Sequence, residues 1–140
     1  MIEAPRIERG CIFGAEHDAS FEGWISQQPR WKLCLAFNAV PPAHSDEVLY
    51  FIATSGVSYF RENHQLADDV LILPPNSYSF LPKETALDFR GLCVVSFAKL
   101  LGKKFELLGR LNDGDLKRCE QRIRSAWVLE PRMKRRLGLL

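Results

Sequence analysis

The chain has 140 residues, of which 46% are hydrophobic and 26% charged, and its formal net charge is +2 at pH 7. This length is typical of one domain, and the composition excludes extended disorder. No apolar run approaches the ~20 residues of a membrane span, and residues 1–6 carry no signal sequence. We therefore expect a single cytoplasmic domain with no membrane partner.

The cysteines indicate a reducing compartment rather than a metal centre. They are Cys11, Cys34, Cys93 and Cys119, and no two of them form a Cys-x-x-Cys pair. Cysteines at that close spacing are the usual signal of a zinc site or a redox dithiol. Isolated thiols among apolar neighbours behave as small hydrophobic side chains. We expect reduced core cysteines, with neither a metal nor a cofactor.

The N-terminal part of the chain is the least regular. Residues 1–29 show no sustained period and are expected to form an irregular arm packed on the core. Residues 31–38 then alternate with a period of two, which is typical of a half-buried strand. If Trp31 is in the core, this alternation places Arg30 and Lys32 together on the outer face.

Further short apolar segments, separated by turn signals, follow along the chain. Residues 48–54 are continuously apolar and rich in β formers, which predicts a central strand buried on both faces. Residues 57–60 alternate again, and residues 70–73, 86–90 and 92–97 also read as strands. Short strands at this spacing predict a sandwich or small barrel and not βαβ units.

The period changes in the last third of the chain. Residues 98–104 predict a helical turn, and residues 105–108 a short edge strand. Asn112 begins an amphipathic helix, because its side chain can cap the helix and acidic residues follow it. Pro131 ends that helix, and residues 129–140 are expected to form a loose basic tail.

The three histidines are not arranged for catalysis or metal binding. His17, His44 and His64 lie in predicted loops at no ligand spacing, so we expect solvated loop side chains. A Ser–His–Asp triad has no Gly-x-Ser-x-Gly elbow to support it. A phosphate-binding glycine loop is also missing, so nucleotide hydrolysis is not indicated.

Thr54 and Ser55 form a hydroxyl pair at the end of the most apolar segment, and Gly56 follows them. Two hydroxyls at a strand terminus can donate hydrogen bonds to a phosphate oxygen. The alternative is that Thr54 completes the strand, while Ser55 and Gly56 only make the turn.

Basic residues offer further candidate contacts for nucleic acid. Arg30 and Lys32 flank Trp31, an arrangement that combines phosphate neutralisation with a base-stacking surface. The alternative is an edge strand whose charges serve solubility. Asp88 and Arg90 share one face of their strand, where they either anchor a polar site or form an ordinary surface ion pair.

Positive charge is concentrated towards the C-terminus. Eight basic residues and two acidic ones lie between Lys117 and Arg136. Such asymmetry indicates an acidic partner, which is either a nucleic acid backbone or an acidic peptide. A solvated helix face is the alternative.

Taken in order, these segments resemble the MazF/PemK-like toxins of toxin–antitoxin modules, particularly their divergent PemK-like branch. The resemblance covers residues 30–128 and is carried by the order and spacing of the segments. Those segments are residues 31–38, 50–55, 70–75, 78–85 and 87–90, followed by Gly109-Arg110-Leu111 and the helix that contains Asp115-Leu116. Where the family usually has an arginine–proline pair, the order here is Pro29-Arg30.

The resemblance implies a mainly β fold with α, a small SH3-like barrel with a C-terminal amphipathic helix. The chain would then divide into an arm (1–29), the barrel domain (30–128) and a basic tail (129–140). Members of the family are typically homodimeric, metal-independent endoribonucleases that cleave single-stranded RNA and are neutralised by an antitoxin protein. By resemblance, Thr54 with Ser55 and Arg30 are the catalytic residues. The expected RNA contacts are Lys32, Arg61, Asp88 and Arg90.

Two other classes of function remain open from the sequence. The same barrel could bind RNA or a partner peptide through its basic helix without cleaving anything. A cupin-like barrel that binds a small molecule is the third possibility, although the lack of clustered histidines disfavours a metal cupin.

Overall fold

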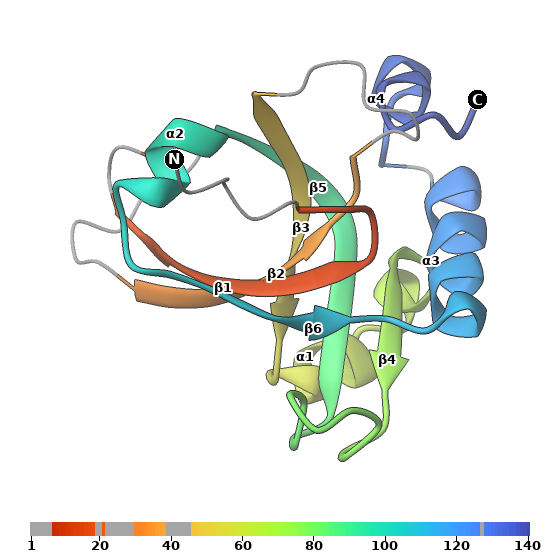
Figure 1. The fold of residues 1–140 in the computed structure, drawn as a ribbon. Coiled ribbons are helices and arrows are strands. Elements are labelled where there is room, and N and C mark those ends of the chain that lie inside the picture. The colour runs from red at the N-terminus through yellow and green to blue at the C-terminus, as the bar shows by residue number, and fades with distance from the viewer. Residues whose placement is uncertain (1–6, 19–20, 22–29, 39–45, 127) are drawn as a thin grey trace.

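The structure of the chain, a computed structural model, describes residues 7–18, 21, 30–38, 46–126 and 128–140 (Figure 1). Its centre is a six-stranded antiparallel sheet in the order β4-β5-β3-β2-β1-β6. The strands are β1 (Cys11–His17), β2 (Arg30–Ala36), β3 (Glu47–Thr54), β4 (Val70–Leu73), β5 (Thr85–Ser96) and β6 (Phe105–Arg110). The helices are α1 (Val57–Glu62), the 3-10 helix η1 (His64–Asp69), α2 (Phe97–Leu101), α3 (Asp113–Ser125) and α4 (Pro131–Arg136).

The sheet has two apolar faces because successive side chains of a strand point to opposite sides. On β3, Leu49, Phe51 and Ala53 point to one face, called the inner face below, where α3 and the segment after α4 complete the main core. Val48 and Tyr50 point to the outer face, which α2 covers in part. Beside β4 and β5, the outer face is covered by α1 and η1.

A bulge in the long strand β5 bends the sheet. Tyr50 of β3 pairs with Cys93, whereas Ile52 pairs with Asp88, so β5 holds extra residues between these two pairs. Bulges bend a strand and increase its twist. In Figure 1, β1, β2 and β6 run across the direction of β3, β4 and β5, and the sheet curls around the main core.

The two end strands of this curled sheet, β4 and β6, do not pair with each other in the described part of the chain. The loop between β4 and β5 spans the opening instead. The Tyr78 hydroxyl donates to Asp115 Oδ2 (2.6 Å) and accepts from the Asn112 backbone N–H (2.9 Å). The structure therefore confirms a mainly β fold with short helices, whereas the sheet curls without closing into a barrel in the described part of the chain.

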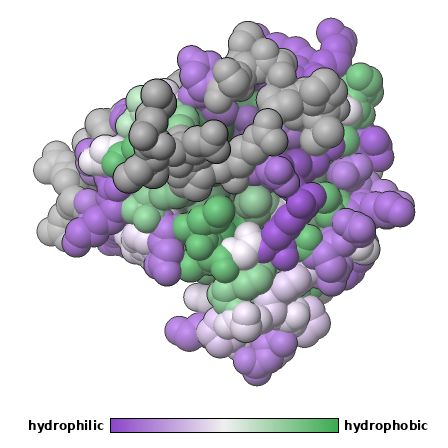
Figure 2. All heavy atoms as spheres, viewed as in Figure 1, coloured by the Kyte–Doolittle hydropathy of each residue, from purple (hydrophilic) through white to green (hydrophobic). Residues whose placement is uncertain are grey.

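Strand β6 keeps an apolar surface. Figure 2 shows hydrophobic side chains gathered over β6 in the view of Figure 1, with hydrophilic side chains around them. Leu107 of β6 is 41% exposed, whereas Leu108 packs against the main core. Because β6 is the last strand in the order of the sheet, the prediction of an edge strand in this segment is confirmed.

The predicted amphipathic helix is present as α3. The Asn112 side chain accepts a hydrogen bond from the Asp115 backbone N–H (2.8 Å) and caps the helix. Asp113 and Asp115 lie in the first turn, where negative charge suits the helix dipole. Cys119 and Ile123 are buried in the main core, as the spacing predicts.

The prediction of a loose tail at 129–140 is wrong. Pro131 begins α4, which is a favoured place for proline because the first helical N–H needs no partner. The helix ends in a Schellman motif, in which Gly138 has φ +75° and the Leu139 N–H donates to the Lys134 carbonyl (2.9 Å). Leu137 and Leu139 are buried, so this segment belongs to the core.

Two predictions about the first half of the chain are also wrong. Residues 11–17 of the predicted arm form β1, which lies between β2 and β6 in the sheet. This strand shows no alternation in the sequence because nearly all of its residues are buried. Residues 57–60, predicted as alternating strand, form α1 with Val57 and Phe60 buried.

All four cysteines are free thiols, and Cys11, Cys34 and Cys119 are buried. Burial raises the pKa of Cys93 to about 11 and that of Cys119 to about 12, so both remain protonated and unreactive at neutral pH. In the described part of the chain, no helix combines the length and the apolar character needed to cross a membrane.

Candidate functional site

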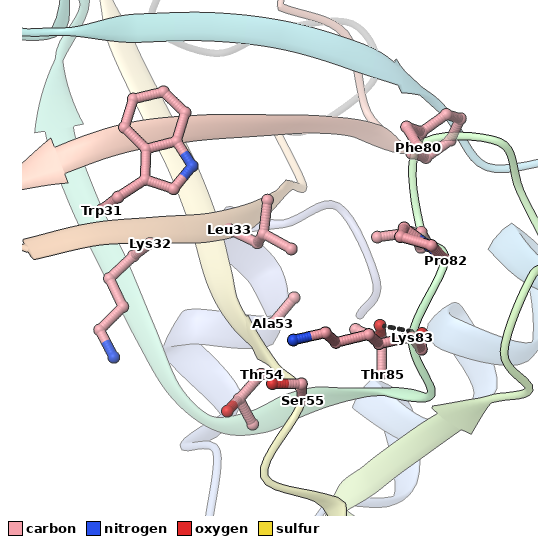
Figure 3. Close-up of a pocket in the computed structure, with 11 residues that line it drawn as sticks. Trp31, Lys32, Leu33, Ala53, Thr54, Ser55, Phe80, Pro82, Lys83 and Thr85 are labelled. Carbon is pink, nitrogen blue, oxygen red and sulfur yellow. Dashed lines mark hydrogen bonds between the residues drawn. The ribbon is translucent and has the colours of Figure 1, made fainter.

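A pocket of about 340 Å³ lies at one end of the curled sheet, where three neighbouring segments meet (Figure 3). We call it the mouth pocket. Strand β2 contributes residues 31–33, β3 and the turn after it contribute residues 53–55, and the loop before β5 contributes residues 80–83. Thr85, the first residue of β5, completes the described lining.

Two aromatic rings of the mouth pocket are held by glycines of neighbouring strands. Trp31 lies so close to Gly14 of β1 that a Cβ there would be 2.1 Å from Trp31 Cζ2. Phe80 lies in the same way over Gly109 of β6, where a Cβ would be 2.2 Å from Phe80 Cε1. Trp31 is 47% exposed, so of the two alternatives for this side chain the structure excludes burial in the core. Its ring is instead a fixed, solvent-facing surface.

The predicted hydroxyl pair lies in this pocket. Thr54 ends β3, and its Oγ1 accepts a hydrogen bond from the Gly56 backbone N–H (3.1 Å). That contact leaves the hydroxyl proton of Thr54 available to a ligand. Ser55 is exposed beside it. The structure confirms that Thr54 completes the strand and that Ser55 and Gly56 lead directly into α1. It also places both hydroxyls at the pocket, and their contact with a phosphate stays a prediction.

Lys83 brings a cation into the mouth pocket. Figure 3 shows its side chain extending from the loop before β5 towards Ala53 and Thr54. The buried Thr85 hydroxyl donates to the Lys83 carbonyl (2.9 Å) and fixes the backbone at this point. Lys32 lies on the rim, where its side chain points away from Trp31.

The charge of the mouth pocket is positive. Two lysines line it, and none of the described lining residues carries a carboxylate. Cations with nearby hydroxyls favour an anionic group such as a phosphate. Aromatic rings next to such a group provide stacking surfaces for a planar ligand.

Arg30 does not line the mouth pocket. It is exposed at the start of β2, where it pairs in register with His17. Because neighbouring residues of a strand point to opposite faces, Arg30 lies on the face opposite to Trp31. The sequence correctly grouped Arg30 with Lys32, but only Lys32 reaches the rim of the pocket.

The other predicted RNA contacts lie elsewhere and are paired within the protein. Arg61 forms a bidentate pair with Glu84, with 2.7 Å between Nη1 and Oε1. Arg90 forms a bidentate pair with Asp88, with both bonds at 2.9 Å, and its guanidinium lies 5.1 Å from the Phe60 ring centroid. Of the two readings of Asp88 and Arg90, this geometry fits the ion pair.

Sequence reasoning missed Phe80 and Lys83. Both lie in the segment 78–85, which carried the resemblance without any residue being singled out as functional. The sequence offers only a general signal, because Lys83 stands in a loop directly before a strand, and nothing in it places Lys83 opposite Thr54.

His17 is not the solvated loop residue that the sequence predicts. It ends β1 and is only 2% exposed. Its Nδ1 lies 3.0 Å from the Ala15 carbonyl and its Nε2 lies 2.9 Å from the Tyr50 hydroxyl. The neutral ring therefore donates from Nδ1 and accepts from Tyr50 at Nε2.

His64 begins η1, and His44 lies outside the described residues. Within the described ranges, no three histidine, cysteine or acidic side chains are grouped so that they could hold a metal ion.

Fold and pocket together define a β-rich domain with a curled, open sheet and a pocket that is basic and aromatic. The chain matches none of the models of known protein families, and it matches no curated protein sequence. A function is therefore supported by the mouth pocket and by the resemblance seen in the sequence.

Proposed function

We propose that the mouth pocket binds single-stranded RNA, and that the protein cleaves this RNA without a metal as the toxin of a toxin–antitoxin module. The observation that supports this most is the joint presence of Trp31, Thr54 and Lys83 in one pocket. A single-stranded nucleic acid offers both an exposed base to stack and a phosphate to neutralise.

The contacts divide by chemical role. A base stacks on Trp31 or Phe80, which is worth about 1–3 kcal/mol per base in single-strand binding proteins. The phosphate lies between Lys83 and the hydroxyls of Thr54 and Ser55, and Lys32 contacts the neighbouring phosphate from the rim. Duplex RNA fits this arrangement poorly because its bases are already stacked and paired.

Cleavage at this site follows the metal-free route through the ribose. The 2′-oxygen attacks the adjacent phosphorus, the bond from phosphorus to the 5′-oxygen breaks, and a 2′,3′-cyclic phosphate remains. Lys83 stabilises the charge on the phosphoryl oxygens and supplies the proton that the leaving 5′-oxygen gains. Thr54 positions the phosphate, and water takes the proton of the 2′-hydroxyl. In this proposal Lys83 has the cationic role that the resemblance assigns to Arg30.

Incubation of the purified protein with end-labelled single-stranded RNA in EDTA tests this proposal. We expect products with 2′,3′-cyclic phosphate ends. Lys83→Gln removes the charge at the phosphate and should lower the cleavage rate about 100-fold, the usual cost of one stabilising donor. Thr54→Val removes only a hydroxyl and should lower the rate less.

Arg30→Gln is the matched control, because it removes one cation from β2 outside the pocket. Cleavage that persists in the Lys83→Gln and Thr54→Val variants, or that is abolished by Arg30→Gln alone, would contradict the proposed site.

A non-catalytic RNA-binding module is the second candidate. It is favoured by one observation, that the described lining of the mouth pocket contains no carboxylate or imidazole to act as a general base. Tight binding that depends on Lys83 but yields no new RNA ends would identify this function. The resemblance also implies a homodimer and an antitoxin partner, and both are proposed here only together with the toxin function.

A further inference from the structure

The edge of β4 that faces away from β5 forms the floor of a second pocket, which shares no lining residue with the mouth pocket and is independent of the RNA proposal. Strand β4 ends the sheet, and three consecutive residues, Val70, Leu71 and Ile72, line this pocket of about 390 Å³. Consecutive strand residues point to opposite faces, so a pocket that touches all three runs along the strand edge. We call it the β4 slot.

The backbone of this edge is unpaired. Within the described part of the chain, the backbone groups of β4 form no hydrogen bond other than those with β5. Such an edge carries N–H and C=O groups that can accept a further strand. Figure 1 shows α3 standing beside β4, on the side away from β5.

The walls of the β4 slot are basic. Arg118 and Arg122 line it from α3, and Arg61 lines it from α1. Arg122 reaches across the slot, where its Nη1 lies 3.3 Å from the Ala67 carbonyl and 3.6 Å from Asp68 Oδ1. Asp68 is 97% exposed, so this ion pair contributes little and can be exchanged for another carboxylate.

No acidic residue lines the slot itself. The carboxylates that pair with Arg61 and Arg118 are Glu84 and Asp115, and both lie outside the lining. The remaining walls, Phe60 and Ala67, are apolar. An occupant must therefore supply backbone hydrogen-bonding groups, carboxylates and small apolar side chains.

These features distinguish the possible occupants. A second copy of the chain joined along β4 would bring the same arginines of both copies together, and their repulsion disfavours that pairing. Single-stranded RNA has no backbone groups that match a strand edge. Phe60 is 4% exposed, so the slot also offers no open ring for base stacking.

We propose that the β4 slot binds an acidic peptide in extended conformation, which adds to the sheet as a strand beside β4. Side chains of the added strand alternate between α3 and α1. Carboxylates on one side meet Arg118 and Arg122, and small apolar side chains on the other meet Phe60 and Ala67. Arg122 leaves its contacts with η1 to bind the peptide.

The probe for this site is a fluorescein-labelled peptide of alternating glutamate and valine, six residues long to exceed the four of β4. Fluorescence anisotropy at physiological salt should show saturable binding. The Arg118→Gln/Arg122→Gln variant should bind about tenfold more weakly or worse, because it loses charge-assisted hydrogen bonds. Lys117→Gln/Arg124→Gln removes the same charge from exposed positions of α3 outside the slot and should bind as the wild type does.

Backbone pairing is tested separately. The same peptide with alternate amides N-methylated keeps its charges but cannot donate along the strand edge, and it should lose at least tenfold in affinity. Circular dichroism of both variants checks that the fold is kept.

Three results would overturn the proposal. The first is no binding at about 1 mM peptide. The second is equal loss in both double variants, which would show unspecific attraction to a basic helix. The third is displacement of the peptide by single-stranded RNA whose own binding requires Arg118 and Arg122, which would make the slot a nucleic acid site.

Discussion

At the scale of single residues, His17 shows how a buried imidazole is kept neutral. Burial lowers the pKa of His17, and the charge of Lys32 lowers it further, although the contact with the Ala15 carbonyl acts in the opposite direction. Protonation would turn Nε2 into a donor that faces the Tyr50 hydroxyl, and the hydrogen bond that this hydroxyl now donates to Nε2 would be lost.

From the lowered pKa of His17 we predict how the free energy of unfolding depends on pH. Because the pKa of His17 is lower in the folded chain, the unfolded chain binds its proton at a higher pH. The free energy of unfolding should be insensitive to His17 above about pH 6.5 and should fall as the pH drops below it, by about 1.4 kcal/mol per pH unit at most. Urea unfolding of the wild type and His17→Gln between pH 5 and 8 measures this. An equal slope in both proteins would contradict the assignment.

Two glycines set the positions of the aromatic rings in the mouth pocket. A methyl group at Gly14 or Gly109 has no room unless Trp31 or Phe80 moves. We expect Gly14→Ala and Gly109→Ala to destabilise the fold by about 1–3 kcal/mol, as overpacking does, and to weaken RNA binding.

Gly91→Ala is the matched control, because a Cβ there meets nothing within 4 Å. Urea unfolding compares the three variants. Equal stability of Gly14→Ala and Gly91→Ala would show that Trp31 is not held against β1.

At the scale of secondary structure elements, α4 and the residues after it act as a cover for the main core. Leu137 is fully buried, whereas Leu140, three residues later, is 71% exposed. We expect Leu137→Ala to lower the free energy of unfolding by about 2–5 kcal/mol and Leu140→Ala to change it little. Denaturant unfolding followed by circular dichroism measures both, and similar small effects would mean that the segment is not part of the core.

Elements marked by a helix cap, by alternation or by a run of β-forming residues were predictable. The helix from Asn112 and the edge strand at residues 105–110 follow from capping and patterning, and both are present. The strand β1 was missed because nearly all of its residues are buried, so its sequence does not alternate, and because Gly14, Ala15 and Glu16 are poor β formers. Helix α1 was missed because its short apolar sequence fits either a strand or one helical turn.

At the scale of the whole molecule, the mouth pocket joins segments that are far apart in the sequence. Thr54 and Ser55 were predictable because they stand at the end of a buried strand. Lys83 was not, since its place opposite Thr54 depends on the curl of the sheet. Arg30 was assigned from its position in the chain, and strand alternation puts it on the other face. His17 lies on the outer face of the sheet, so the sheet separates it from the mouth pocket, which opens on the inner face.

Binding of fluorescein-labelled single-stranded RNA, followed by anisotropy at two salt concentrations, tests the central claim most directly. We predict that Lys83→Gln and Trp31→Ala each weaken binding about tenfold, because one removes a phosphate contact and the other a stacking surface. Only Lys83→Gln should reduce the salt dependence, and Arg30→Gln should change neither quantity. Binding that Arg30→Gln weakens while Lys83→Gln and Trp31→Ala leave it unchanged would show that RNA does not occupy the mouth pocket.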